Sequence, residues 1–413
     1  MIINGMAIHC NRKLVKAMLH RYKVSNFQSF LAPVEVSMAL GGKVTKLGWE
    51  AVSPSGERLS TAMGVVGPNA AGKTALLKPV VFGAWFIAQS FHVKPDAQIP
   101  VAPHFSAPDE PTELEFEVDG SDGRLWRYVL KLTRARVMHE AVYQKKERFN
   151  YVFIRDWDEA TQSYDVKQQG FDFAPKEARR VRQNASLIST AAQYGVELAK
   201  ELASVAVQSN IVDTGRLAFR AENDLPNAAR HFSGNAEQRE AMVRLLRSWD
   251  LGLSDVQLRE LTVQGAGEES QKIWYPFGLH TARNGSQHEL MFFQESSGTQ
   301  SAFVLLSRLL QTLTVGGLAV IDEFESDLHP HMLEPILDLF ANPSTNPHHA
   351  QLLFTCHAIE VLSVLHKSQI MLVEKNELGE STAFRMDAVK GIRNDDNFYA
   401  KYMSGAYGAV PQL

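Results

Sequence analysis

A glycine-rich octapeptide near the start of the chain has the residue types that hold a phosphate group. It matches the pattern G-x-x-x-x-G-K-[ST] at every fixed position. Its members are Gly67, Pro68, Asn69, Ala70, Ala71, Gly72, Lys73 and Thr74. Glycines let the backbone curl so that consecutive N–H groups point at one phosphate. A chance match is the alternative, but average residue frequencies give roughly one such match per hundred chains of this length. The octapeptide therefore predicts nucleotide binding.

Two side chains at the end of this loop would complete the phosphate site. We expect Lys73 to reach the β- and γ-phosphates and the hydroxyl of Thr74 to ligate Mg²⁺. A mostly apolar run follows at residues 75–88, and a helix there would direct the positive end of its dipole at the phosphates. The ligands predicted from these residues are ATP and Mg²⁺.

A pair of carboxylates after an apolar run supplies the acidic half of such a site. Residues 318–321 are Leu-Ala-Val-Ile, and Asp322 and Glu323 follow directly. Asp322 suits the metal, and Glu323 suits a general base that polarises the attacking water. An exposed acidic turn after a core strand is the alternative, which the presence of a phosphate loop disfavours. We therefore expect Lys73 and Glu323 to be catalytic, and Thr74 and Asp322 to hold Mg²⁺.

A small-residue segment precedes this acidic strand. Ser297 and Gly298 lie just before a helix expected over residues 301–313, and helix N-termini bind anions. Alone, the signal is weak, because serine and glycine are ordinary loop residues. Its place shortly before the acidic strand makes it a candidate for a further phosphate contact.

The composition limits the classes of protein to which the chain can belong. Its 413 residues are 45% hydrophobic and 21% charged, which excludes a disordered or fibrous chain. The net charge of −4 argues against binding to DNA through overall charge, although it allows a local basic patch. Cys10 and Cys356 cannot form a disulfide framework and fit a reducing cytosol. No uninterrupted apolar stretch approaches the ~20 residues of a membrane span. We therefore expect a cytoplasmic protein without membrane contact.

The elements around these motifs predict an α/β fold. Helix and strand signals alternate over the last third of the chain, which favours a central, mainly parallel sheet. Alternating residues at 113–118 and 124–132 predict an antiparallel β subdomain. Residues 144–166 show no clear period, and residues 176–207 have a helical composition. We therefore place a mostly helical insertion at residues 140–260.

The order of the motifs resembles that of the ABC-type ATPases, whose sequence order is phosphate loop, signature helix, acidic strand, D-loop and switch histidine. Residues 296–300, Ser-Ser-Gly-Thr-Gln, are similar to their Leu-Ser-Gly-Gly-Gln signature. Residues 326–330 occupy the D-loop position, and His357 follows the next apolar strand. The resemblance implies a P-loop head of the ABC-ATPase type, in which two heads enclose the nucleotide between them.

The same resemblance implies roles for residues outside the phosphate loop. Ser297, Gly298 and Gln300 of one head would contact the γ-phosphate held by the other, so that the chain must form at least a dimer to hydrolyse ATP. His357 would be the catalytic switch, and a structural bond at a helix N-terminus is the alternative for this histidine.

The motif positions divide the chain into three segments. The first, residues 1–139, is the N-terminal half of an ATPase head with the phosphate loop and the β subdomain. The insertion at 140–260 follows. The last, residues 261–413, is the C-terminal half with the signature, acidic strand, D-loop and switch histidine.

Two further segments narrow the resemblance. Residues 22–30, Tyr-Lys-Val-Ser-Asn-Phe-Gln-Ser-Phe, resemble the opening of SMC-, RecF- and OLD-like heads. Residues 402–411, with their Tyr-Gly-Ala-Val-Pro ending, resemble a family of stand-alone bacterial anti-phage ATPases that includes RloA/AbiL-type proteins and the ATPase of PARIS systems. This implies the sensor or regulatory subunit of an abortive-infection system, which controls a separate nuclease or toxin. A nucleic acid or a phage protein is the implied trigger. We expect no fused TOPRIM nuclease, because the chain ends soon after the last ATPase strand.

Two other functions stay open. The first is a RecF/SMC-like DNA repair ATPase that binds DNA, which the weak overall basicity disfavours. The second is a scaffold that uses ATP only to assemble, which Glu323 disfavours. The locally basic residues 176–183 are a candidate contact to nucleic acid or to a phage protein, and a solvated helix face is the alternative. Arg216 and Arg220 are similarly ambiguous.

Overall fold

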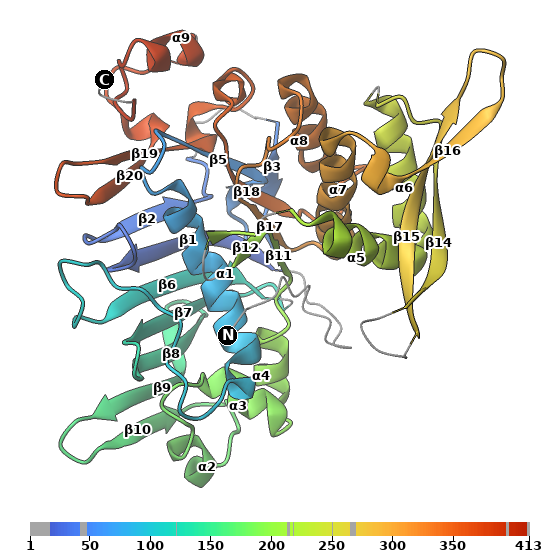
Figure 1. The fold of residues 1–413 in the computed structure, drawn as a ribbon. Coiled ribbons are helices and arrows are strands. Elements are labelled where there is room, and N and C mark those ends of the chain that lie inside the picture. Colours follow the sequence, from blue (N-terminus) through green and yellow to red (C-terminus); the bar gives the residue numbers. More distant parts are fainter. Residues whose placement is uncertain are drawn as a thin grey trace.

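A computed structural model of the chain describes residues 17–41, 48–120, 122–212, 215–217, 219–249, 251–264, 270–393 and 396–410. Two large sheets form the body of the protein, and one long helix packs against both (Figure 1). Pro411, the last residue of the predicted family ending, lies outside the described residues.

The first sheet is the mainly parallel sheet that the sequence predicts. Its six strands have the order β11-β17-β18-β5-β19-β20, and β20 alone is antiparallel to its neighbour. The strands are β5 (Ala62–Val66), β11 (Val207–Ser209), β17 (Leu318–Ile321), β18 (Gln351–Thr355), β19 (Ile370–Lys375) and β20 (Ser381–Arg385). Every residue of β5, β17 and β18 is buried, as expected for parallel strands covered on both faces.

The second sheet is an antiparallel β subdomain. Its seven strands have the order β10-β9-β8-β7-β6-β1-β2. They are β1 (Met18–Ser25), β2 (Val34–Ser37), β6 (Thr112–Asp119), β7 (Leu125–Leu132), β8 (Val137–Lys145), β9 (Phe149–Asp158) and β10 (Ser163–Gln168). With both sheets in place, the predicted fold class, an α/β P-loop head with a mainly parallel sheet and an antiparallel subdomain, is confirmed.

Helix α1 (Lys73–Gln89) fills the space between the two sheets. One core cluster joins its apolar side chains to Leu318 and Val320 of β17 and to residues of β1, β6 and β7. Ala319 and Ile321 belong instead to the cluster beneath α7 (Ser297–Val315) and α8 (Leu333–Ala341). Successive side chains of β17 therefore point to opposite faces of the parallel sheet, and each face is covered by helices.

The expectation of a mostly helical insertion from residue 140 is wrong for its first part. Residues 140–168 continue the antiparallel sheet as β8, β9 and β10. The period of β9 is obscured because Arg155, on its buried face, is fully enclosed and pairs with Glu140 at 3.4 Å. Helices follow only afterwards. They are α2 (Pro175–Arg179), α3 (Leu187–Gln193), α4 (Glu197–Leu202), α5 (Ala221–Ser233) and α6 (Ala236–Ser248).

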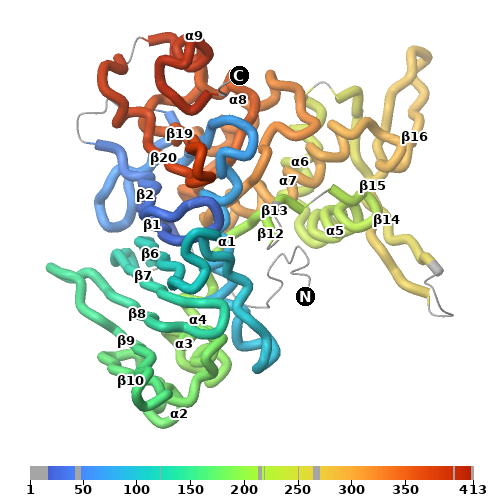
Figure 2. Tube along the Cα trace, turned by 60° about the vertical axis from the view of Figure 1, so that its left-hand side comes forward, coloured from blue at the N-terminus to red at the C-terminus, as the bar shows by residue number. Residues whose placement is uncertain are grey.

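A separate three-stranded antiparallel sheet projects from the body beside α5 and α6 (Figures 1 and 2). It consists of β14 (Asp255–Gln264), β15 (Ser270–Thr281) and β16 (Gln287–Met291). Two small hairpins complete the strands, β3 (Glu50–Val52) with β4 (Arg58–Ser60), and β12 (Ile211–Val212) with β13 (Gly215–Arg216). The remaining helices are η1 (Ser90–His92), η2 (Phe292–Gln294), η3 (Pro330–Met332), η4 (Ile359–Ser363), η5 (Lys367–Gln369), η6 (Met386–Ala388) and α9 (Phe398–Met403).

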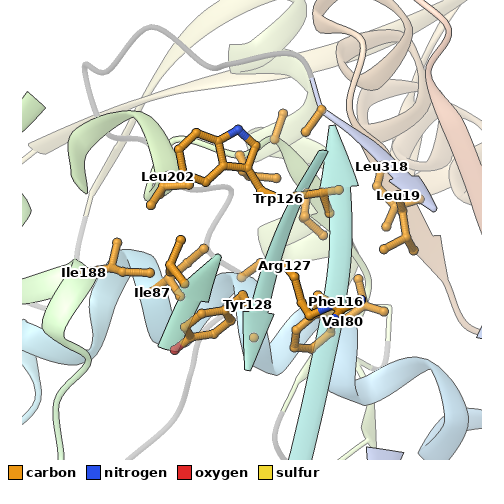
Figure 3. Close-up of a pocket in the computed structure, with 18 residues that line it drawn as sticks. Leu19, Val80, Ile87, Phe116, Trp126, Arg127, Tyr128, Ile188, Leu202 and Leu318 are labelled. Atoms are coloured by element: carbon orange, nitrogen blue, oxygen red, sulfur yellow. The ribbon is translucent and has the colours of Figure 1, made fainter. Parts of the chain in front are cut away.

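The stretch from α1 through η1, Lys73–His92, is long and apolar enough to cross a membrane by length and composition alone. Half of its most apolar window is buried inside the protein, where α1 forms part of the core between the sheets. Beside it lies a cavity of about 90 Å³ whose walls are almost entirely apolar, with Phe116, Trp126 and Leu202 among them (Figure 3). Walls of this kind do not suit a polyanionic ligand.

Candidate nucleotide site

The phosphate loop connects β5 to α1, as predicted, and its glycines are required by close packing. A Cβ on Gly67 would lie 2.2 Å from the carbonyl oxygen of Val373 in β19. Gly72 has a φ of +112°, and a Cβ there would lie 2.6 Å from Oγ of Ser381 and 2.7 Å from Oγ of Ser29. The loop therefore keeps its curl only with glycine at these two positions.

Residues 22–30, which resemble the opening of SMC- and RecF-like heads, support the phosphate loop through Ser381. The carbonyl of Ser29 accepts a hydrogen bond from the Ser381 amide at 2.7 Å, and the Ser381 hydroxyl donates to the Ala71 carbonyl at 2.6 Å. The side chain of Asn26 ties this segment to the loop before β6 by donating to the carbonyls of Ala107 and Glu110. The opening segment therefore has a structural role beneath the phosphate loop.

The ammonium group of Lys73 is folded back into the loop. It donates to the carbonyls of Gly67 at 2.9 Å and Pro68 at 3.0 Å, and the residue is buried. Burial lowers the pKa of Lys73, although Asp322 and the nearby carboxylates of Glu325 and Glu323 oppose this effect. Two neutral carbonyl acceptors thus hold the Lys73 ammonium group at the loop, and a bound phosphate would take their place.

Thr74 and Asp322 meet across 248 residues of sequence. The Thr74 hydroxyl lies 2.8 Å from Oδ2 and 3.1 Å from Oδ1 of Asp322. A hydroxyl and a carboxylate together form an all-oxygen donor pair, which is the kind of ligand that Mg²⁺ prefers. These two residues fit the metal that the sequence predicts for them.

Two polar residues that the sequence analysis missed fix the acidic pair. Thr355, at the end of β18, donates to Oδ1 of Asp322 at 2.6 Å and accepts from the Glu323 amide at 2.7 Å. Asn210, directly after β11, accepts from the Asp322 amide at 2.7 Å and donates to its carbonyl at 2.8 Å. The neighbouring strands therefore hold Asp322 from both sides. Position at the carboxyl end of a parallel strand is the signal that could have indicated Thr355.

Glu323 has a backbone conformation that is uncommon for this residue type. Its φ is +49°, in the left-handed region, where a residue with a Cβ is strained. Its carboxylate accepts a hydrogen bond from the guanidinium of Arg216, which lies in the β12–β13 hairpin. The sequence left Arg216 ambiguous, and the structure places it beside the expected general base.

His357 lies where a switch histidine is expected, at the exit of the strand next to β17. Its side chain is exposed, and its amide donates to Oε1 of Glu325. The preceding residue, Cys356, is fully buried, and burial raises the pKa of its thiol. His357 lines the cavity that holds the other site residues, whereas Cys356 belongs to the core, as expected for a small buried residue.

A cavity of about 950 Å³ brings these groups together. Asn69, Lys73, Thr74, Asp322, Glu323, Thr355 and His357 all line it. Lys78, Arg216 and Lys375 add positive charge to the same walls. A cavity with several cations in its walls suits a polyphosphate.

The signature residues lie outside this cavity. Ser296 is the N-cap of α7, where its hydroxyl accepts from the Thr299 amide at 3.2 Å. A Cβ on Gly298 would lie 2.8 Å from the carbonyl oxygen of Asp327, so the signature packs against the D-loop of the same chain. Gln300 is buried and donates to the Glu295 carbonyl at 2.8 Å. Its amide therefore supports its own loop in this structure.

The basic segment at residues 176–183 shows no contact with the cavity. It contains the short helix α2, and its Arg182 donates to the carbonyls of Phe91 and Val93. Arg182 therefore has a structural role within the chain. This agrees with the alternative to a nucleic-acid contact at this one position.

Comparisons with known proteins agree with a P-loop ATPase head. A family model described as "AAA domain, putative AbiEii toxin, Type IV TA system" matches residues 62–363, from β5 through the acidic strand to η4. No match was found among curated proteins.

Several solved structures align with most of the chain at low sequence identity. The SMC head domain from Thermotoga maritima is 12% identical with a TM-score of 0.42, and the alignment covers 89% of this chain and 98% of that chain. The Smc head domain with a coiled coil and joint from Pyrococcus yayanosii is 9% identical with a TM-score of 0.40, covering 94% and 99%. A structure of the recombination mediator RecF with ATP is 10% identical with a TM-score of 0.33, covering 83% and 95%.

Proposed function

Since the chain belongs to the AAA-domain family whose description names the AbiEii toxin and a type IV toxin–antitoxin system, we propose that it is a Mg²⁺-dependent ATPase. The observation that carries this proposal is the pairing of Thr74 with Asp322 at 2.8 Å. It joins a phosphate loop to an acidic strand, and Glu323 follows directly. These are the parts that phosphoryl transfer to water requires.

Each residue of the site would have a separate role in ATP hydrolysis. Loop amides and Lys73 bind the β- and γ-phosphates, for which Lys73 leaves the loop carbonyls. Thr74 and Asp322 would hold Mg²⁺, which when bound would supply positive charge beside the phosphates. Glu323 accepts a proton from water as the water oxygen bonds to the γ-phosphorus. The bond from the γ-phosphorus to the β–γ bridging oxygen breaks, and ADP and phosphate result.

We propose that two heads complete each site. No signature residue lines the cavity of its own chain. Ser297 and Gly298 instead begin helix α7 at the protein surface, where a second head could contact them. In a dimer these two residues would approach the γ-phosphate bound to the other head, and His357 would act as the switch beside it. Gln300 would shape the signature loop from inside, because its amide already serves the loop carbonyls.

We also propose a cellular role in anti-phage defence. The chain would act in the cytoplasm as the sensor or regulatory subunit of an abortive-infection system and would control a separate nuclease or toxin. The family description and the resemblance of residues 402–411 support this role. Infection assays with and without the neighbouring genes test it, and loss of protection in Lys73→Ala cells is expected. Full protection by that variant would contradict an ATP-dependent role.

Steady-state hydrolysis tests the enzymatic proposal. Lys73→Ala should lose nucleotide binding, and chelation of Mg²⁺ should stop turnover by the wild-type protein. Glu323→Gln should bind ATP without turning it over, whereas the exposed Glu377→Gln serves as a matched control with wild-type activity. Equal turnover in all of these samples would reject the proposed site. Strong stimulation by DNA would favour a RecF/SMC-like repair function instead.

Light scattering tests the two-headed arrangement. With ATP and Mg²⁺, Glu323→Gln should double its mass, because hydrolysis no longer separates the heads. Ser297→Arg should prevent the mass increase without loss of ATP binding. A Glu323→Gln protein that binds ATP and stays monomeric would contradict the composite site.

A further inference from the structure

The β12–β13 hairpin brings a segment of the predicted insertion to the catalytic carboxylate. β11 pairs in parallel with β17, and Asn210 then clamps the backbone of Asp322. The Leu217 amide donates to the Asn210 carbonyl at 2.7 Å and closes the base of the hairpin. The hairpin is thus fixed at the carboxyl end of the acidic strand, and Arg216 at its end lines the nucleotide cavity.

Arg216 binds two elements of the site at once. One terminal nitrogen donates to Oε2 of Glu323, and the other donates to Oγ of Ser326 in the D-loop at 2.7 Å. The Arg216 and Glu323 side chains are 26% and 41% exposed, respectively. Within the described residues, the Arg216 guanidinium holds the Glu323 carboxylate, and the Thr355 hydroxyl holds the Glu323 backbone. Without Arg216, a side chain this exposed would sample several rotamers.

We propose that Arg216 is a positioning residue for the ATPase reaction, which orients the Glu323 carboxylate and ties it to the D-loop. By holding Oε2, the guanidinium would leave Oε1 to accept from the attacking water in the cavity that Glu323 lines. A base oriented by a third group is a recurring arrangement in catalysis. The inference rests on the proposed function, because it assigns Arg216 a role in the hydrolysis assigned to that site.

The arrangement also gives the insertion a defined part in the reaction. Helices α5 and α6 share a core cluster with α7, the helix that begins at the signature, and they follow the hairpin directly in sequence. The signature helix α7 therefore packs against α5 and α6, the helices that follow the hairpin carrying Arg216 in the sequence. Arg216 would therefore link the position of the Glu323 carboxylate to the signature helix α7, which would meet the other head in a dimer.

Kinetics of Arg216 variants test the proposal. Arg216→Ala should lower kcat by about 10- to 100-fold, the size of effect expected when a reacting group is misplaced by about 1 Å, while the Kd for ATP changes little. Arg216→Lys keeps the charge without the fork and should recover part of the loss. Arg220→Ala, an exposed arginine on the same segment, is the matched control and should keep the wild-type kcat.

A double-mutant cycle separates this role from general destabilisation. If Arg216 acts through Glu323, then Arg216→Ala should add little further loss of kcat in a Glu323→Asp background, where a shorter carboxylate keeps turnover measurable but lies out of reach of the Arg216 contact. Additive losses, an unchanged kcat or a raised kcat in a folded Arg216→Ala protein would overturn the proposal. If Arg216→Ala does not fold, the comparison of Arg216→Lys with Ser326→Ala, which removes the second anchor, decides in its place: both should lower kcat. Absence of ATP turnover in the wild-type protein would instead reject the proposed function itself, so the two failures are distinguishable.

Discussion

The hydroxyl of Thr355 donates a hydrogen bond to Oδ1 of Asp322 at 2.6 Å, so the strand next to β17 fixes the carboxylate that is assigned to Mg²⁺. The same hydroxyl accepts from the Glu323 amide and thereby holds the strained backbone of the proposed general base. The buried side chain of Thr355 thus anchors the Asp322 carboxylate and the Glu323 backbone together.

Thr355→Val should therefore reduce both stability and turnover. Valine fills the same space, but the Glu323 amide loses its partner, and Oδ1 of the buried Asp322 keeps only its longer bond from Thr74. The free energy of unfolding should fall by about 1–3 kcal/mol, the cost of an unsatisfied buried group. Urea denaturation and ATPase assays measure the two effects, with the exposed Thr382→Val as control. Wild-type stability and kcat in Thr355→Val would show that the hydroxyl has no such role.

Gly72→Ala should prevent formation of the phosphate loop. An alanine there must adopt a φ of +112° and would bring its Cβ within 2.6–2.7 Å of two serine hydroxyl oxygens. We expect loss of ATP binding in a calorimetric titration. Gly195→Ala isolates the effect of backbone strain, because Gly195 has a φ of +89° with no atom near the added Cβ. Its cost should be about 1 kcal/mol of stability with ATP binding intact. Equal ATP affinity in both variants would contradict the packing argument.

Stability should decrease with rising pH through the titration of His20. Burial lowers the pKa of this imidazole, but hydrogen bonds and charge from Asp119 and Glu57 outweigh that effect, so its pKa is raised above 6.5. The folded state therefore binds the proton more tightly than the unfolded state. The resulting stability is fully present below pH 6.5 and is lost as the pH rises through the higher folded pKa. Urea denaturation across this window should show the decline in the wild-type protein, and His20→Gln should show a smaller slope. Identical slopes would contradict the assignment.

Much of the fold was predictable because its signals are local. The phosphate loop, the buried runs of β17 and β18 and helix α7 each show their pattern within a short window, and the structure confirms all of them. Residues 144–166 show no clear period, because β9 and β10 are partly exposed and because Arg155 occupies a buried position. Hydrophobic periodicity does not reveal a strand whose inner face carries a charge.

The candidate site was predictable only in its motifs. Lys73, Thr74, Asp322, Glu323 and His357 all line one cavity, whereas their assigned roles stay predictions. Asn210, Arg216 and Thr355 belong to no motif. Their roles arise from strand order, which places β11 and β18 on either side of β17. The pairing of these strands could not be obtained from the spacing of residues along the chain.

Single-turnover hydrolysis of bound ATP by the wild-type protein and by Glu323→Gln tests the proposed ATPase site most directly. Protein in excess over radiolabelled ATP with Mg²⁺ reports binding and phosphate release in the same sample. The predicted result is full binding by both proteins and phosphate release by the wild-type protein alone. Release at the wild-type rate from Glu323→Gln would contradict the assignment of Glu323 as the base, and no release from a wild-type protein that binds ATP would contradict the ATPase function.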